Sequence, residues 1–136
     1  MIIGYTQGTY DMFHIGHLNL LRNAKALCDF LVVGVNSDDL VKQYKGKSVI
    51  VPLAERMDIV GSVRFVDQVI SCDSLDKMIA FKKVHFNKLF IGDDWKGNSR
   101  WEETGRIMKE VGVELVYLPH TQGISSTMLR DKLNVY

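Results

Sequence analysis

The chain has 136 residues, of which 46% are hydrophobic and 24% charged, so it is long enough for one domain around one hydrophobic core. Seventeen basic and sixteen acidic residues leave a formal net charge of +1, which argues against nonspecific binding to nucleic acid or acidic membranes. The longest apolar run, FLVVGV at 30–35, is far shorter than the roughly 20 residues of a membrane-spanning helix.

The first predicted elements are a strand and a helix joined by a glycine-containing loop. Residues 2–7 (IIGYTQ) form a short β-prone run, and residues 14–27 carry apolar side chains at helical spacing. The run at 30–35 is apolar on both sides, which is typical of a central parallel strand. The polar residues 36–39 that follow favour a turn and a helix N-cap.

The rest of the chain continues this alternation. Residues 41–51 have no clear period and contain three lysines, so we interpret them as a mobile basic loop. The patterns predict helices at 53–63, 75–84, 101–111 and 126–133, and strands at 66–70, 88–92 and 113–118. Alternating strands and helices predict an α/β domain, in which helices cover both faces of a central parallel sheet. Such sheets bind ligands beyond the carboxyl ends of their strands.

Two further features bear on where the protein works. Its N-terminus, MIIGYTQ, lacks the charged region, long apolar stretch and cleavage site of a signal peptide, so we expect a cytoplasmic protein. Cys28 and Cys72 are too few for a disulfide framework and lack CxxC spacing, so we expect two free thiols.

The segment GTYDMFHIGH at 8–17 is the strongest candidate for chemistry. His14 and His17 lie about one helical turn apart, and a helix starting near His14 would aim its free N–H groups at the same place. Gly8 permits a sharp exit from the strand, and Gly16 permits close approach of a ligand, so the pattern indicates a phosphate site. The alternative that the two histidines form half of a metal site is less favoured, because no third ligand follows at a recognisable spacing. The alternative that they are ordinary polar residues on a helix surface is also less favoured, because glycines and Asp11 surround the pair.

This segment resembles the HxGH signature of nucleotidyltransferases. The segments RFVDQVI (64–70), GDDW (92–95) and TQGISST (121–127) resemble, in order and spacing, those of cytidylyltransferases, especially the enzymes that use glycerol 3-phosphate. The resemblance covers nearly the whole chain. It implies that residues 1–136 form one Rossmann-like domain and that two copies pair through 64–70 as a homodimer.

The resemblance also implies the reaction. CMP would pass from CTP to a phosphorylated alcohol, most of all sn-glycerol 3-phosphate, giving CDP-glycerol for an envelope or capsule polymer, with Mg²⁺ accompanying CTP. Nucleic acid and membranes would not be partners. Phosphoethanolamine, phosphocholine or another phosphorylated acceptor, transfer from ATP, and a nucleotide-binding module without catalysis remain the alternatives.

The resemblance assigns site residues by position, without any protein ligand for a metal. Catalytic roles fall to His14, His17, Lys45, Lys47 and Arg64. Nucleotide contacts fall to Gly8, Thr9, Tyr10, His14, Gly16, His17, Asp94, Thr121, Gly123, Ile124, Ser125 and Ser126. Acceptor contacts fall to Asp11, Lys45, Arg56, Arg64 and Trp95.

Several of these residues also have simpler interpretations. The lysines fit a solvated loop, Arg56 fits a surface helix, and Asp11 fits a turn. Asp94 fits a capping residue, and Trp95 fits a buried anchor. The chain also departs from the cytidylyltransferase pattern, because His120 and Gln122 stand where an arginine and a glutamate are usual.

Overall fold

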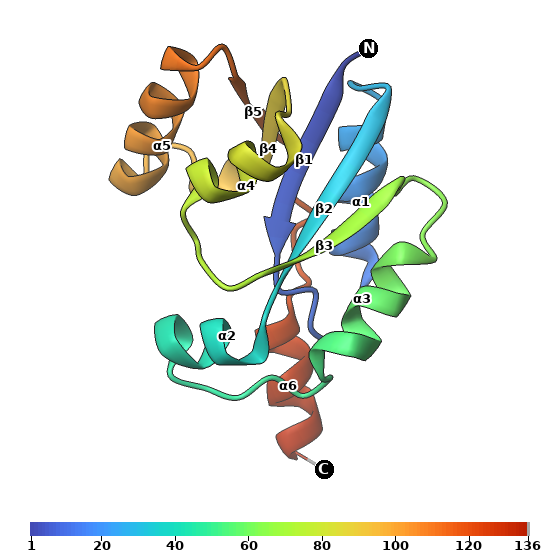
Figure 1. Ribbon diagram of the computed structural model, residues 1–136. Coiled ribbons are helices and arrows are strands. Elements are labelled where there is room, and N and C mark those ends of the chain that lie inside the picture. Colours follow the sequence, from blue (N-terminus) through green and yellow to red (C-terminus); the bar gives the residue numbers. More distant parts are fainter. Residues whose placement is uncertain (136) are drawn as a thin grey trace.

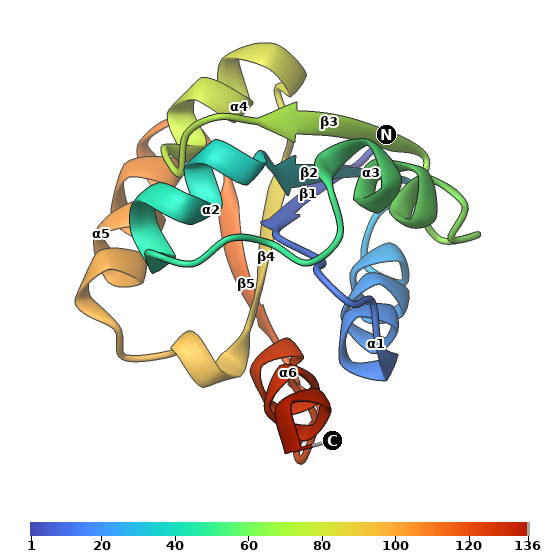
Figure 2. The same cartoon turned by 90° about the horizontal axis from the view of Figure 1, so that it is seen from below.

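A computed structural model describes residues 1–135, and its centre is one parallel sheet of five strands (Figures 1 and 2). The strands lie in the order β3-β2-β1-β4-β5, so the chain starts in the middle of the sheet and builds outward on both sides. Their bounds are β1 Ile3–Gly8, β2 Phe30–Asn36, β3 Gln68–Cys72, β4 Lys88–Gly92 and β5 Glu114–Leu118. The predicted α/β class and parallel sheet are therefore confirmed.

Helices follow every strand. They are α1 Ile15–Lys25, α2 Asp38–Lys45, α3 Leu53–Gly61, α4 Lys77–Val84, α5 Ser99–Glu110 and α6 Ser126–Val135, with one 3₁₀ turn, η1 Asp93–Trp95. No helix among the described residues has the length and hydropathy needed to cross a membrane.

Two hydrophobic clusters, one on each face, hold the helices on the sheet. In β2, Leu31 and Val33 pack with Leu21 and Ala24 of α1 and with α3, whereas Val32 packs with α4 and α5. This division follows from strand geometry, because successive side chains point to opposite faces. Both faces of β2 are thus buried, as the continuous apolar run predicted.

The predicted loop at 41–51 is partly wrong, because its first residues belong to α2. Ser37 caps this helix by accepting a hydrogen bond from the Leu40 backbone N–H at 3.2 Å, and Leu40 and Val41 are buried. The helix ends at Gly46, whose φ of 69° lies in the left-handed region that glycine adopts at low cost. The helix places the backbone of Lys45 at the carboxyl ends of the strands and leaves its side chain exposed.

The carboxyl ends of the strands all lie at one edge of the sheet. Figure 1 shows α2 and α6 beyond this edge, and Figure 2 looks onto it from below. Segments from the start, middle and end of the chain therefore meet at the edge where parallel sheets bind ligands.

Candidate active site

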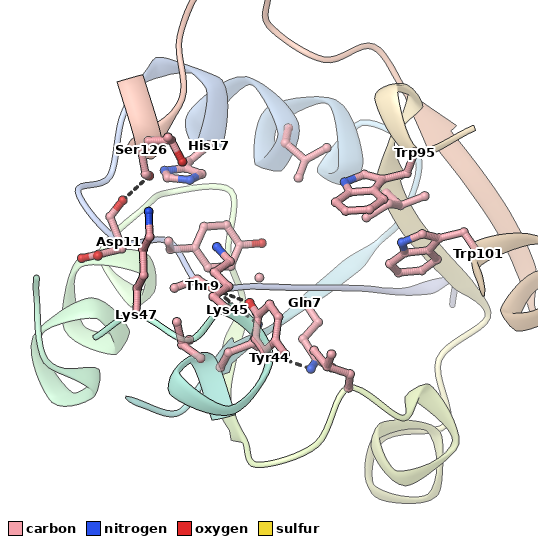
Figure 3. A pocket seen from close by; sticks show the side chains of 18 of the residues that line it. Gln7, Thr9, Asp11, His17, Tyr44, Lys45, Lys47, Trp95, Trp101 and Ser126 are labelled. Carbon is pink, nitrogen blue, oxygen red and sulfur yellow. Dashed lines mark hydrogen bonds between the residues drawn. The ribbon is translucent and has the colours of Figure 1, made fainter. Parts of the chain in front are cut away.

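A cavity of about 610 Å³ opens at the carboxyl edge of the sheet (Figure 3). It brings together half of the residues that the sequence predicts for the site. Those that line it are Gly8, Thr9, Tyr10, Asp11, His17, Lys45, Lys47, Trp95 and Ser126.

The loop between β1 and α1 is held in an unusual backbone conformation. Tyr10 and Met12 have φ angles of 56° and 49°, in the left-handed region that L-residues rarely adopt. Residues in this region persist where the surrounding structure fixes them, and they gather at functional sites. Tyr10 is 4% exposed and its ring lies edge-on to that of His17, so the loop and the histidines are positioned together.

The two predicted histidines stack at the start of α1. Their ring centroids are 3.8 Å apart with an interplanar angle of 22°. His14 is the N-cap residue, and its Nδ1 accepts a hydrogen bond from the Gly16 backbone N–H at 3.0 Å. Nδ1 of His17 accepts from the His14 backbone N–H at 3.2 Å. A Cβ on Gly16 would lie 2.8 Å from the His14 ring, so the arrangement requires glycine at that position.

These hydrogen bonds determine which nitrogen of each ring carries the proton. A nitrogen that accepts a hydrogen bond has no hydrogen, so each neutral ring is protonated at Nε2. Burial lowers the pKa of His14, and burial together with the proximity of His14 and Lys45 lowers the pKa of His17 to about 3. Both rings are therefore neutral near pH 7, and each offers one Nε2–H donor at a helix N-terminus.

Lysines and a serine complete this end of the cavity. Lys45 ends α2 and Lys47 follows one residue after the left-handed Gly46, and both side chains are exposed. Ser126, the first residue of α6, donates a hydrogen bond from its hydroxyl to the Asp11 backbone carbonyl. Figure 3 shows Lys47, Asp11 and Ser126 near His17, although they come from three different parts of the chain.

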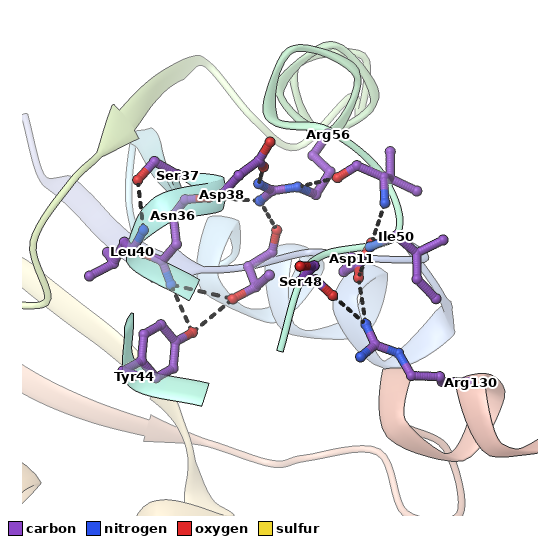
Figure 4. A network of polar contacts seen from close by, with 12 residues as sticks. Asp11, Asn36, Ser37, Asp38, Leu40, Tyr44, Ser48, Ile50, Arg56 and Arg130 are labelled. Atoms are coloured by element: carbon purple, nitrogen blue, oxygen red, sulfur yellow. Dashed lines mark hydrogen bonds and ion pairs between the residues drawn. The ribbon is translucent and has the colours of Figure 1, made fainter. Parts of the chain in front are cut away.

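The Asp11 carboxylate holds neighbouring segments together through hydrogen bonds (Figure 4). Its carboxylate accepts backbone N–H groups of Ile50 and Val51, each at 2.9 Å, and a bond from Arg130 at 3.1 Å. Only 5% of the residue is exposed. These hydrogen bonds connect the segment after α2 and helix α6 to the loop between β1 and α1, which leads into the histidines.

Arg56 is buried and its donors are used within the protein (Figure 4). Nη1 donates to the backbone carbonyls of Thr9 at 2.7 Å and Asn36 at 2.8 Å, and Nε donates to that of Val51 at 2.7 Å. Nη2 pairs with Asp38. Arg56 does not line the cavity, so the structure gives it a supporting position rather than the predicted position at the acceptor.

Arg64 lies away from the cavity within one chain. It is exposed in the loop between α3 and β3, which leads into the amino end of β3, and its guanidinium carbon lies 5.2 Å from the Phe65 ring centroid. The cavity is at the opposite, carboxyl edge. One chain therefore does not bring Arg64 to the histidines.

The segment before α6 packs against the N-terminal half of α1. Asn19 donates a side-chain hydrogen bond to the Thr121 hydroxyl at 2.9 Å, and the position of a Gly16 Cβ would be 3.6 Å from Ile124. Gly123 adopts a φ of 79°, and the Ser125 hydroxyl accepts from the Met128 backbone N–H at 3.1 Å. These four predicted nucleotide residues lie beside the histidine helix, outside the lining of the cavity itself.

The 3₁₀ turn after β4 carries an exposed polar cluster. Asp93 accepts hydrogen bonds from the backbone and ring of His120, and this pairing raises the pKa of His120. Asp94 is also exposed, and ligand atoms from these three residues lie within 4.8 Å of one another. Trp95 is 41% exposed and lines the cavity. His120 therefore presents a cation here only when it is protonated.

A hydrogen-bonded network in the lining of the cavity was not predicted. The Gln7 amide donates to the Asn36 side chain at 2.8 Å and to the Ser74 carbonyl at 2.9 Å. Asn36 reaches the Thr9 and Tyr44 hydroxyls, which are 2.9 Å from each other. Gln7 and Asn36 are polar residues near the carboxyl ends of two predicted strands, and this placement is the sequence signal from which the network could have been predicted.

Lys77, Arg100 and Trp101 form the far wall of the cavity. Lys77 is 6% exposed, and its Nζ lies 5.1 Å from the ring centroid of Trp101, which is also 6% exposed. Arg100 is exposed, with its guanidinium carbon 6.0 Å from the same ring centroid. Burial of a lysine cannot be read from the residue pattern of a short helix, so Lys77 was not predicted to lie at the site.

Comparison with known proteins assigns a family. Residues 5–132 match the family model described as Cytidylyltransferase-like. Glycerol-3-phosphate cytidylyltransferase of Bacillus spizizenii is 36% identical over 129 residues, which are 94% of each chain. Ethanolamine-phosphate cytidylyltransferase of Arabidopsis thaliana is 38% identical over 90% of this chain but only 30% of that longer protein. A lipopolysaccharide core biosynthesis protein from Thermoplasma volcanium superposes with a TM-score of 0.78 at 27% identity, covering 90% of this chain and 99% of that one.

Proposed function

Because the chain belongs to the cytidylyltransferase-like family and is a nucleotidyltransferase, we propose that it transfers CMP from CTP to sn-glycerol 3-phosphate, giving CDP-glycerol and pyrophosphate. The observation that carries this proposal is the stacked pair of neutral imidazoles at the N-terminus of α1. Their Nε2–H groups form a preorganised pair of donors for a phosphate chain.

The reaction needs no covalent intermediate on the protein. An oxygen of the acceptor phosphate attacks the α-phosphorus of CTP, and the bond between that phosphorus and the oxygen of the β-phosphate breaks. The electron pair leaves with pyrophosphate. The task of the protein is to hold the two reactants in line and to stabilise charge that develops on the phosphate oxygens.

The two lysines supply the mobile part of this stabilisation. Lys45 and Lys47 flank Gly46 at the mouth of the cavity, and their exposed ammonium groups can follow the triphosphate and then release pyrophosphate. The Nε2–H donors on α1 are fixed by backbone hydrogen bonds, so fixed and flexible donors would approach the phosphates from two sides.

Mg²⁺ fits this site as an ion carried by the triphosphate. Asp11 is a poor protein ligand for it, because its carboxylate already accepts bonds from Ile50, Val51 and Arg130. When bound to the phosphates, Mg²⁺ supplies charge neutralisation. The lysines and the histidine Nε2–H groups would hold the remaining phosphate oxygens.

Phosphoethanolamine is the alternative acceptor, since ethanolamine-phosphate cytidylyltransferases are among the relatives. The lining of the cavity contains five basic and two acidic side chains, and His17 in it is neutral. This excess of positive charge disfavours an acceptor with an ammonium group, because like charges repel strongly in a partly desolvated site.

We also propose that the enzyme is a homodimer that pairs at β3. This strand is an edge of the sheet, so one side of its backbone lacks a strand partner within the described chain. The exposed Arg64 and the half-buried Phe65 lie in the loop just before this strand. Pairing at β3 would therefore cover Arg64, a cation that lies away from the cavity of its own chain.

The test is pyrophosphate release with CTP or ATP, Mg²⁺ and a panel of phosphorylated alcohols, with His17→Ala as the comparison. We expect CTP-dependent release with glycerol 3-phosphate, reduced by about a hundredfold or more in the variant because one preorganised donor is lost. Pyrophosphate release with ATP but not with CTP would overturn the assignment of CTP as the nucleotide substrate. Tight CTP binding without release would favour a module that has lost catalysis.

A further inference from the structure

The hydroxyl groups of Thr9 and Tyr44 form a hydrogen-bonded pair in the lining of the cavity. Their oxygens are 2.9 Å apart, although Thr9 follows β1 and Tyr44 belongs to α2. Figure 3 shows both side chains beside Lys45, whose Nζ lies 5.7 Å from the Tyr44 ring centroid. The pair therefore lies next to one of the cations that would hold phosphate groups in the proposed transfer.

A chain of side-chain amides fixes the direction of the hydrogen bonds that reach this pair. The Ser74 carbonyl can only accept, so the Gln7 atom at 2.9 Å from it is the amide nitrogen Nε2. The same nitrogen donates to Oδ1 of Asn36 at 2.8 Å. Nδ2 of Asn36 therefore faces the two hydroxyls, and it donates to Thr9 at 3.4 Å and to Tyr44 at 3.3 Å (Figure 4). Both hydroxyl oxygens thus receive a hydrogen bond from one amide.

Counting protons shows which hydroxyl is left with a free O–H. The pair holds two hydroxyl protons, and only one of them lies between the two oxygens. A phenol is a stronger donor and a weaker acceptor than an alcohol, so Tyr44 donates to Thr9. The Thr9 oxygen then accepts from both Tyr44 and Asn36, which occupies its two lone pairs. The remaining proton belongs to Thr9, and towards any further partner this hydroxyl can only donate.

We propose that Tyr44 is a positioning residue, which together with Asn36 makes the Thr9 hydroxyl a directed donor to a substrate phosphate. This inference rests on the proposed CMP transfer and adds a residue to its phosphate site. Phosphate oxygens are strong acceptors, so they match a hydroxyl that can only donate. A ligand ammonium can only donate, and it would find both lone pairs of the Thr9 oxygen occupied.

Two variants remove the two hydroxyls separately. Thr9→Val removes the donor, and Tyr44→Phe removes the group that orients it while keeping the ring beside Lys45. Loss of a hydrogen bond to a charged group should lower kcat/KM by roughly tenfold to a hundredfold in Thr9→Val. Loss of a bond between neutral groups should lower it by roughly threefold to tenfold in Tyr44→Phe. Thr9→Ser keeps the hydroxyl and should retain most of the activity.

The double variant separates positioning from a purely structural role. Because Tyr44 acts through Thr9, adding Tyr44→Phe to the Thr9→Val protein should lower kcat/KM by less than about twofold further. A structural role of the tyrosine hydroxyl would lower kcat/KM equally in both backgrounds. Tyr117→Phe serves as the control and should leave kcat/KM unchanged, because Tyr117 is half-buried on β5 and outside the lining of the cavity.

Calorimetry identifies the substrate whose phosphate Thr9 contacts. The nucleotide used is a CTP analogue with a methylene group between the α- and β-phosphorus atoms, so that it binds with Mg²⁺ but releases no pyrophosphate. Weaker binding of this analogue to Thr9→Val would assign the contact to a nucleotide phosphate. Weaker binding of glycerol 3-phosphate alone, measured on the protein with the analogue bound, would assign it to the acceptor phosphate.

Three results would overturn the proposal. The first is unchanged affinity of Thr9→Val for both ligands, and the second is an equal effect of Tyr44→Phe with and without the Thr9 hydroxyl. The third is a larger loss in Tyr44→Phe than in Thr9→Val, because it would mean that the tyrosine contacts the ligand itself. The same comparison of calorimetric affinities holds where no acceptor turns over. Coupled losses of affinity without pyrophosphate release by the unchanged protein would support this inference and contradict the proposed transfer.

Discussion

The histidine pair shows how two backbone N–H groups determine side-chain chemistry. Each donates to an Nδ1, so each ring is left with one proton on Nε2 and no free acceptor nitrogen. The rings therefore act as hydrogen-bond donors and not as proton acceptors. This role needs no charge on the ring, which agrees with the lowered pKa values of both residues.

The lowered pKa of His17 predicts a specific dependence of stability on pH. Unfolded histidine titrates near pH 6.5, whereas folded His17 has a pKa of about 3, so the unfolded state binds more protons between these values. The free energy of unfolding should therefore fall as the pH drops from about 6.5 towards 3. Urea denaturation at pH 7.5 and 4.5 should show a smaller loss in His17→Gln than in the unchanged protein. An equal loss in both proteins would show that His17 titrates normally.

Arg56 should be more important for stability than for acceptor binding. Arg56→Lys removes the paired Nη1 bonds to the Thr9 and Asn36 carbonyls, and unsatisfied buried groups cost about 1–3 kcal/mol each. We expect a loss of about 2–4 kcal/mol in urea denaturation, with KM for the acceptor changed little. Unchanged stability with a tenfold rise in that KM would instead support direct contact with the acceptor.

The sequence predicted which residues gather at the site better than it predicted what each one contacts. The spacing of His14 and His17 implies one face of a helix, and that is a local property. The hydrogen-bond partners of the Asp11 carboxylate are 39 or more residues away in the sequence. Those of Arg56 are up to 47 residues away. Such contacts, and the burial of Lys77, arise only when the sheet assembles, so no local pattern encodes them.

Among the secondary-structure elements, α2 determines where the basic residues lie. Its N-cap at Ser37 and its end at Gly46 fix the position of Lys45, and Lys47 follows beyond the glycine. The prediction of a loop from residue 41 missed this helix because the lysines obscured a short apolar stripe at Leu40, Val41 and Tyr44. The strands were predicted to within two residues, because each contains a short run of apolar or β-prone residues. The 3₁₀ turn η1, with three residues, is too short to have a recognisable period.

Replacing Gly46 should disturb CTP binding more than it disturbs folding. Gly46 and Gly112 have φ angles of 69° and 82°, and an added Cβ at either would have no neighbour within 4 Å. Gly46→Ala and Gly112→Ala should each cost about 1 kcal/mol of stability through the left-handed backbone alone. Only Gly46→Ala should raise KM for CTP several-fold, because only Gly46 separates the two lysines of the site. Equal KM values in both variants would contradict the role of the α2 end.

The parallel sheet brings the start, middle and end of the chain to one edge, and it leaves β3 as an open strand at its side. A sheet edge of this kind favours pairing with a second copy unless it is protected. In the loop just before this strand, the ring centroid of Phe65 lies 5.4 Å from the guanidinium carbon of Arg22 and 5.2 Å from that of Arg64. The proposed dimer would bury this cluster.

Light scattering coupled to gel filtration should give twice the chain mass of 15.5 kDa. Phe65→Ser should shift the protein toward the monomer mass because it removes the apolar centre of the proposed interface. Val111→Ser provides the control, since Val111 is 39% exposed and lies at the end of α5, just before β5 at the opposite edge of the sheet. A single-chain mass for the unchanged protein would rule out this dimer.

The central claim is direct transfer of CMP to an acceptor phosphate, and ³¹P NMR of the reaction products tests it most directly. The protein would be mixed with CTP, Mg²⁺ and glycerol 3-phosphate that carries ¹⁸O in its phosphate. The account predicts a cytidine diphosphate ester and pyrophosphate in equal amounts, with the ¹⁸O label in the bridging oxygen and none in pyrophosphate. CTP that stays intact, or label that appears in pyrophosphate, would contradict it.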